Sequence, residues 1–246
     1  MADERAHKNP SKLRWMKVGG VFVLLIAVGA LWWHFTYTTS WKEEVLLHDG
    51  RKVIVERSYK QDPFARREIG QSAPRVEDVI RFAIPGTNQE IEWKNDWGAQ
   101  LQSNLTLLMI DFQNDTPFIA AYPSSCPGYN KWGRPNPPYV FFKYTGKEWE
   151  RVTLEDFPSE FKKANVMIGG YSEGMPKQSL YSIDDLNTNN KYYKDKMPEL
   201  YKFVREAVTF GRANMAASCK EMVFYKCGWI GPDGELGKNH MDKFCD

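Results

Sequence analysis

Residues 41–60, WKEEVLLHDGRKVIVERSYK, decide the fold class. Two runs rich in β-formers flank Asp49-Gly50. An Asp-Gly pair in this setting is a strong signal for a two-residue hairpin turn, because both positions tolerate a positive φ. The stretch therefore predicts a β-hairpin.

Further strand candidates follow up to residue 152, and turn residues join neighbouring candidates in pairs. They lie at residues 77–85, 90–94, 105–112, 116–122, 139–144 and 148–152. The run 105–112 is strongly apolar, which predicts a central strand.

The chain after residue 152 has a mixed character. We expect a short helix at 156–163, short strands at 165–168 and 222–226, and a polar loop at 184–196 capped by Ser182 or Asp184. Residues 198–218 predict the main helix: proline stands at the start, an acidic residue lies in the first turn, and an apolar stripe follows. The stripe comprises Leu200, Phe203, Val204, Ala207 and Val208.

Hairpin-linked strands that precede a helix favour an antiparallel α+β fold over alternating βαβ units. The expected fold class is therefore α+β, with an N-terminal transmembrane helix followed by an antiparallel β-rich domain with one main C-terminal helix.

Residues 18–37 carry the membrane signal. The stretch has 20 residues, or about 30 Å of helix, which matches the hydrocarbon core of a bilayer. Basic residues precede it, and Trp32, Trp33, Tyr37 and Trp41 gather at its other end. The basic flank keeps the N-terminus in the cytoplasm, so the chain after residue 40 is exported. Cleavage near Val28-Gly29-Ala30 is the alternative, and it exports the same domain.

The charge balance argues against nucleic acid as a partner. The chain has 33 basic and 31 acidic residues, and residues 1–35 account for five of the basic and two of the acidic ones. The remaining 211 residues are close to neutrality and lack the basic surface that phosphate-backbone binding requires.

The four cysteines, Cys126, Cys219, Cys227 and Cys245, all follow the membrane segment. An even number in an exported domain predicts two disulfides, with three pairings open. Their spacing does not match a structural zinc site, and the histidines do not cluster, so no metal is expected.

The most unusual stretch is residues 122–139, YPSSCPGYNKWGRPNPPY. Prolines restrict the backbone, and the aromatic rings offer flat area with little entropy to lose on binding. We expect one of two roles: a platform for a glycan or peptide formed by Tyr129, Trp132, Arg134 and Tyr139, or an ordered crossover that packs its own aromatics over the sheet. The second role is favoured.

Catalytic motifs are weak. Residues 170–174 match the G-x-S-x-G nucleophile elbow, but that motif requires a helix on a mostly parallel sheet, so a glycine-rich turn is the better interpretation. The sequence shows no nucleotide or dinucleotide fingerprint, and no cofactor is expected.

Two segments, residues 41–50 (WKEEVLLHDG) and 129–143 (YNKWGRPNPPYVFFK), resemble parts of uncharacterised bacterial membrane-anchored envelope proteins. The resemblance covers roughly residues 40–160. It implies a bacterial source and an inner-membrane location. Together with the patterns above, the expected organisation is residues 1–17 as a cytoplasmic tail, 18–37 as the single span, and 41–246 as a periplasmic domain (β-rich over 41–152, helix-containing over 153–246). The resemblance implies no activity.

These observations favour a binding or scaffold module of the cell envelope with a protein or glycan partner, and an enzyme is the less favoured class. One alternative is an envelope hydrolase that uses carboxylates among Glu77, Asp78, Asp111 and Asp115. Another is a subunit assembled through its transmembrane helix, whose small residues are Gly19, Gly20, Gly29 and Ala30.

Overall fold

A computed structural model describes residues 20, 21, 23–29, 38–62, 75–96, 105–172, 174–231 and 233–245. The chain divides into two compact units, Met1–Thr39 and Ser40–Asp246. Residues 20, 21 and 23–29 are helical. None of the described helices combines the length and the apolar character needed to cross a membrane. The predicted span at 18–37 lies largely outside the described residues.

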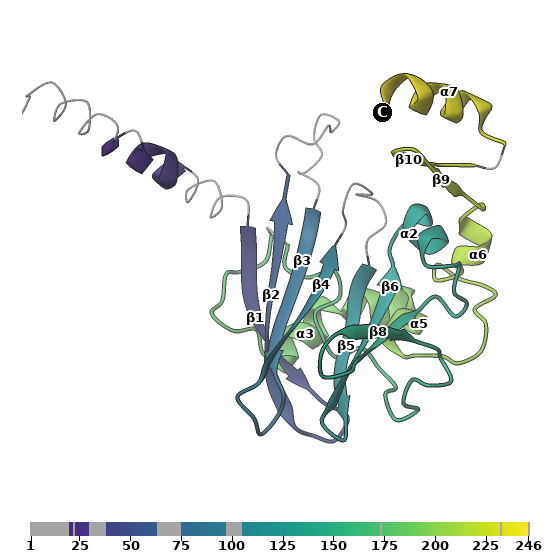
Figure 1. Cartoon of the computed structure of the whole chain (residues 1–246). Coiled ribbons are helices and arrows are strands. Elements are labelled where there is room, and N and C mark those ends of the chain that lie inside the picture. The colour runs from purple at the N-terminus through teal and green to yellow at the C-terminus, as the bar shows by residue number, and fades with distance from the viewer. Residues whose placement is uncertain are drawn as a thin grey trace, which may run out of the picture. The chain divides into compact units, whose positions relative to one another are not determined.

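Two four-stranded antiparallel sheets follow one another along the chain (Figure 1). The first contains β1 (Thr38–Leu46), β2 (Lys52–Gln61), β3 (Arg75–Ala83) and β4 (Glu90–Asp96) in that order. The second contains β5 (Leu105–Gln113), β6 (Thr116–Pro123), β7 (Val140–Tyr144) and β8 (Trp149–Val152). Each strand pairs with the next along the chain, so the predicted antiparallel α+β class is confirmed.

The turn residues explain this order. Asn114 and Asp115 both have positive φ (48° and 60°) and join Gln113 to Thr116, as the tight turn of a hairpin requires. The Asp49-Gly50 hairpin is also confirmed, but its turn is longer than expected. The backbone N–H of Leu47 donates to the carbonyl of Arg51, and within this turn only Gly50 has a positive φ.

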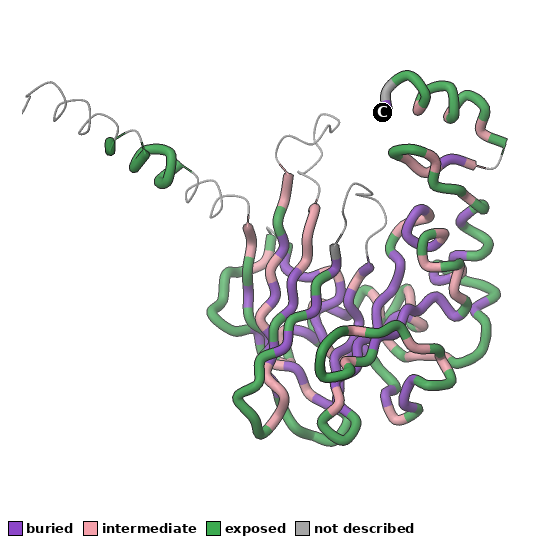
Figure 2. Tube along the Cα trace, viewed as in Figure 1, coloured by how far each residue is buried: buried purple, intermediate pink, exposed green. Residues whose placement is uncertain are grey.

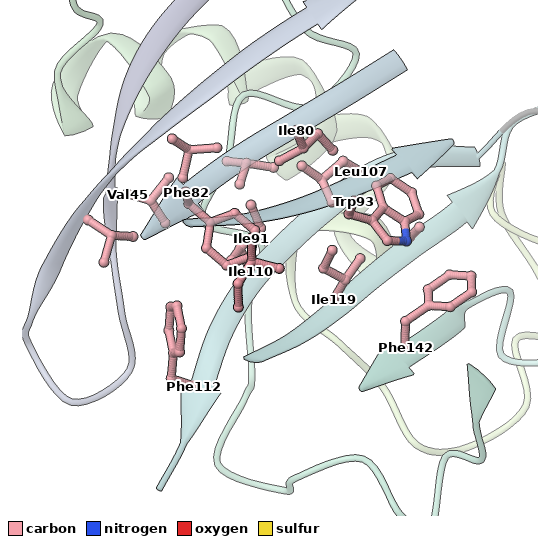
Figure 3. Close-up of a cluster of buried hydrophobic side chains, with 14 of the residues drawn as sticks. Val45, Ile80, Phe82, Ile91, Trp93, Leu107, Ile110, Phe112, Ile119 and Phe142 are labelled. Atoms are coloured by element: carbon pink, nitrogen blue, oxygen red, sulfur yellow. The ribbon is translucent and has the colours of Figure 1, made fainter. Parts of the chain in front are cut away.

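The first core lies between the two sheets (Figure 3). Alternate residues of each strand supply it, because side chains on a strand point to opposite faces. Val45, Phe82 and Trp93 come from the first sheet, and Ile110 and Phe142 come from the second. The edge-to-face contact of Phe82 with Phe112, with ring centroids 5.8 Å apart, joins the two layers.

A second core covers the opposite face of the second sheet. Leu108, Met109, Phe118 and Phe141 pack there against the C-terminal part of the chain. The second sheet is thus buried on both faces, and Figure 2 shows the buried segments concentrated in the strands. This double burial explains why the strands β5 and β6 are apolar almost throughout. The prediction of a central strand at 105–112 is wrong, because β5 lies at the edge of its sheet and is apolar through burial of both faces.

A short helix, α2 (Cys126–Lys131), lies between β6 and β7. The described elements after β8 are also short: α3 (Ile183–Asn189), α4 (Lys191–Lys196), α5 (Pro198–Tyr201), α6 (Met215–Ser218), β9 (Val223–Tyr225), β10 (Gly228–Ile230) and α7 (Glu235–Phe244). The last strand expected at 222–226 corresponds to β9.

Four predictions fail in this region. Residues 198–218 do not form one helix, because the chain leaves helical geometry at Lys202 and Gly211 has a φ of 78°. Residues 184–196, expected as a loop, form α3 and α4. Ser182 caps α3 as predicted: its hydroxyl accepts from the backbone N–H of Asp185, whose carboxylate accepts from the N–H of Ser182. Residues 156–163 form turns, and residues 165–168 form no strand.

Two asparagines hold segment 165–168. The carboxamide of Asn165 accepts from the backbone N–H of Ile110 and donates to the carbonyls of Ile110 and Leu46. Buried Asn190 donates to the carbonyl of Val166 and accepts from the N–H of Ile168. Hydrogen bonds from these two side chains therefore replace the backbone hydrogen bonds that a strand would form.

A buried ion pair fixes the next residues against the first sheet. Arg57 and Glu43 are almost inaccessible, and the guanidinium lies 3.1 Å from the carboxylate. Arg57 also donates to the carbonyl of Met167, and Glu43 accepts from the indole N–H of Trp41. A Cβ at Gly170 would approach the Trp41 ring to 2.9 Å, so this turn requires glycine.

Candidate functional site

The structure places most of the predicted aromatic platform inside the molecule. Tyr129 and Tyr139 are 1% and 3% exposed, so both side chains are buried in the domain. Tyr139 donates its hydroxyl to the carbonyl of Glu199, and desolvation raises its pKa to about 12. These two rings belong to the second core, which matches the favoured role of an ordered crossover.

The two other predicted contact residues are also held by the protein. The Trp132 ring meets Phe142 edge to face, and the guanidinium of Arg151 lies 5.6 Å from the Trp132 ring centroid. Arg134 donates to the carbonyl of Cys219 and lies over the Tyr129 ring. Sequence reasoning predicted an ordered aromatic segment here. The contacts of Trp132 and Arg134 pack this segment against the rest of the domain.

Both expected disulfides are present. Cys126 pairs with Cys219 and ties the start of α2 to the end of α6, 93 residues later. Cys227 pairs with Cys245 and closes the chain around β10 and α7.

A large hollow lies at the second core, between segment 154–163 and segment 202–205. We call it the aromatic cleft; its volume is about 470 Å³. Its apolar lining is formed by Phe141, Leu154, Phe157, Phe161, Phe203 and Val204. Phe141 and Phe157 are stacked with their ring centroids 4.1 Å apart, which fixes a flat wall. This size and lining are typical of a site for a small ligand.

Basic side chains complete the cleft. Lys162, Lys163, Lys202 and Arg205 line it together with Ser159, and none of the described lining residues is acidic. The Arg205 guanidinium donates to the carbonyls of Leu154 and Phe157, so it braces the wall of the cleft.

A smaller hollow of about 300 Å³ adjoins the cleft and shares Phe161, Lys162 and Lys163 with it. We call it the histidine hollow. His48 reaches it from the β1–β2 turn, and its Nδ1 lies 2.8 Å from the carboxylate of Asp111. Asp111 also accepts from the backbone N–H groups of His48 and Phe112.

These contacts fix the state of the pair. Asp111 is 3% exposed, and burial raises its pKa, while hydrogen bonds from His48 and Phe112 oppose that shift. A carboxylate that accepts from several N–H groups favours Nδ1 of His48 as the donor, which leaves Nε2 on the side away from Asp111.

The four carboxylates of the hydrolase hypothesis have separate partners. Glu77 pairs with Lys94 and Asp115 with Arg51, while Asp78 lines a small hollow near Arg57 and Arg75. Asp111 instead shares the histidine hollow with Glu160, which sequence reasoning missed. Hydrogen bonds, including one from Gln113, lower the pKa of Glu160.

The remaining motifs place no further group in these hollows. Ser172 of the G-x-S-x-G match is exposed and begins no helix. Within the described part of the chain, no cluster of three or more His, Cys, Asp or Glu residues has the geometry to hold a metal ion.

Sequence reasoning also missed the aromatic cleft. The available signal was the segment 157–163, FPSEFKK, in which two phenylalanines adjoin two lysines.

No family model matches the chain, and no curated protein or solved structure matches it.

Proposed function

We propose that this chain is a single-pass, membrane-anchored protein whose exported domain is a ligand-binding module, with the aromatic cleft as its binding site. The cleft is the observation that carries the proposal. Its rings come from a strand of the second sheet and from loops tied to that sheet, so the site is preorganised.

Two features support the anchor and the compartment. The described part of the N-terminal helical stretch exposes Val21, Val23, Leu24, Leu25 and Ile26, each at 58–66%. A bilayer would remove this apolar surface from water. The two disulfides fit an oxidising compartment such as the bacterial periplasm.

Exposed Ser159 lines the cleft and provides a direct test. The full chain is placed in lipid nanodiscs and titrated calorimetrically with 4-phenylbutanol, a water-soluble ligand with an apolar body. Empty nanodiscs supply the baseline. We expect saturable binding that Ser159→Trp abolishes, because the indole fills the cleft.

Ser179→Trp is the matched control, since Ser179 is an exposed serine outside the cleft. It should bind like the unmodified chain. Equal binding by both variants, or no saturable heat from the unmodified chain, would reject the aromatic cleft as the site.

The histidine hollow favours a second candidate function, ester hydrolysis. His48 Nε2 takes a proton from water, the water oxygen bonds to the ester carbonyl carbon, and the C–O bond to the alcohol breaks. The alcohol oxygen leaves with the proton from His48. Asp111 orients the imidazole for this step.

Release of p-nitrophenolate from p-nitrophenyl acetate tests this candidate. His48→Asn keeps an N–H donor for Asp111 but removes the base, so we expect release to fall to the rate of buffer alone. His240→Asn, in the exposed helix α7, should retain the full rate. If all three proteins release p-nitrophenolate at the buffer rate, the hollow is not catalytic.

A further inference from the structure

We infer that the ligand of the aromatic cleft carries an acidic group, which the ammonium groups of Lys162, Lys163 and Lys202 bind at the rim. The ligand is therefore an amphipathic anion, with an apolar body against the phenyl rings and a carboxylate or phosphate at the lysines. This inference rests on the proposed function.

The backbone brings Lys163 and Lys202 together, and Lys162, the sequence neighbour of Lys163, also lines the cleft. Segments 162–164 and 201–203 run antiparallel, and Lys163 lies opposite Lys202 in an isolated bridge. The N–H of Phe203 donates to the carbonyl of Lys162 at 2.9 Å, and the N–H of Ala164 donates to the carbonyl of Tyr201 at 2.9 Å. Directly opposed residues in antiparallel pairs have Cβ atoms about 4.5–5.5 Å apart.

Like charges in this position oppose folding, because opposed residues of the same sign repel each other. Elsewhere on the surface several lysines are paired, such as Lys52 with Glu44 and Lys226 with Asp242. Among the described residues, the ammonium groups of Lys162, Lys163 and Lys202 have no ion pair or hydrogen bond.

The surrounding charges compensate for this cluster only in part. Arg205 adds positive charge beside the lysines, donates to two carbonyls and interacts electrostatically with Glu155. Asp111 and Glu160 line the adjoining histidine hollow, where Asp111 is bonded to His48 and the Glu160 carboxylate accepts from Gln113 at 2.7 Å. A bound anion would supply the missing negative charge, while the phenyl wall would hold an apolar body next to it.

A matched series of ligands tests the head group alone. The full chain in nanodiscs of zwitterionic lipid is titrated calorimetrically with 4-phenylbutanoate, 4-phenylbutanol and 4-phenylbutylammonium, which share one apolar body. We expect the carboxylate to bind about tenfold more tightly than the alcohol, since hydrogen bonds between two charged groups are stronger than those to a neutral hydroxyl. The ammonium should bind most weakly.

The triple variant Lys162→Gln/Lys163→Gln/Lys202→Gln should bind all three ligands about equally. The control variant Lys177→Gln/Lys191→Gln/Lys196→Gln removes the same charge from exposed lysines outside the cleft and should keep the preference for the carboxylate. Melting curves of both variants verify that they fold.

The outcomes separate this inference from the proposed function. Saturable binding of 4-phenylbutanol with no preference for the carboxylate, or a preference that both triple variants lose equally, would overturn the anionic ligand while leaving the cleft as a site. Failure of all three ligands would overturn the proposed function itself.

A further arm identifies the source of the anion. In nanodiscs that contain anionic lipid, weaker apparent binding of 4-phenylbutanoate to the unmodified chain would show that a lipid head group occupies the rim. Unchanged binding would show a soluble amphiphile.

Discussion

Asn165 joins elements that lie far apart in the sequence. Its carboxamide bonds the carbonyl of Leu46, at the end of β1, and both backbone groups of Ile110 in β5. One side chain therefore satisfies polar groups of two sheets at once. Nothing in the local sequence distinguishes this asparagine from one in a loop, so the sequence alone could not reveal its role.

We expect Asn165→Ala to lower the free energy of unfolding by about 2–4 kcal/mol, because partly buried backbone groups lose their partner. Denaturant titration measures this difference. Asn187→Ala, at an exposed position of α3, is the matched control and should change stability by less than about 0.5 kcal/mol. Equal stability of the two variants would contradict the bridging role.

At the scale of elements, the hairpins were predictable because their signals are local. Asp49-Gly50, Asn114-Asp115 and Gly146 each mark a turn, and strand pairing follows from the chain order. The apolar run at 105–112 predicted a strand, but its predicted central place in the sheet was wrong, because β5 lies at the edge of the second sheet. It could not show that Leu108 and Met109 face one core while Leu107 and Ile110 face the other, because that split depends on the register shift in β5.

The helix expected at 198–218 shows where periodicity misleads. Leu200 and Val208 are buried as the apolar stripe suggests, but Phe203 and Val204 line the aromatic cleft. The backbone of residues 201–203 is engaged with residues 162–164, and this distant pairing replaces helical hydrogen bonds. The same pairing creates the lysine rim, so the part of the site that sequence reasoning missed is the part made by long-range contacts.

At the scale of the whole molecule, the two disulfides constrain different parts of the chain. The Cys126–Cys219 bond links residues 93 apart and ties α6 to α2, which lies between β6 and β7 of the second sheet. The Cys227–Cys245 bond spans 18 residues and encloses β10 and α7, which pack on each other through Ile230 and Gly237. The sequence predicted two disulfides, but only the fold shows which cysteines are paired.

We expect Cys126→Ser/Cys219→Ser to lower the global free energy of unfolding by about 4–5 kcal/mol, since the entropy lost by the unfolded chain grows with loop length. Cys227→Ser/Cys245→Ser should leave the main denaturant midpoint unchanged and expose α7 to limited proteolysis. A greater loss of global stability in Cys227→Ser/Cys245→Ser than in Cys126→Ser/Cys219→Ser would contradict this prediction.

The edges of the two sheets bear on how the domain behaves when crowded. Tyr181 exchanges backbone hydrogen bonds with Lys42 and Glu44 on the outer side of β1, and Asn165 occupies the outer side of β5 at Leu108 and Ile110. An unpaired edge can template strand addition from another chain. Because loops of the same molecule already occupy part of these two edges, copies of the domain at high concentration are protected there from polymerising strand by strand.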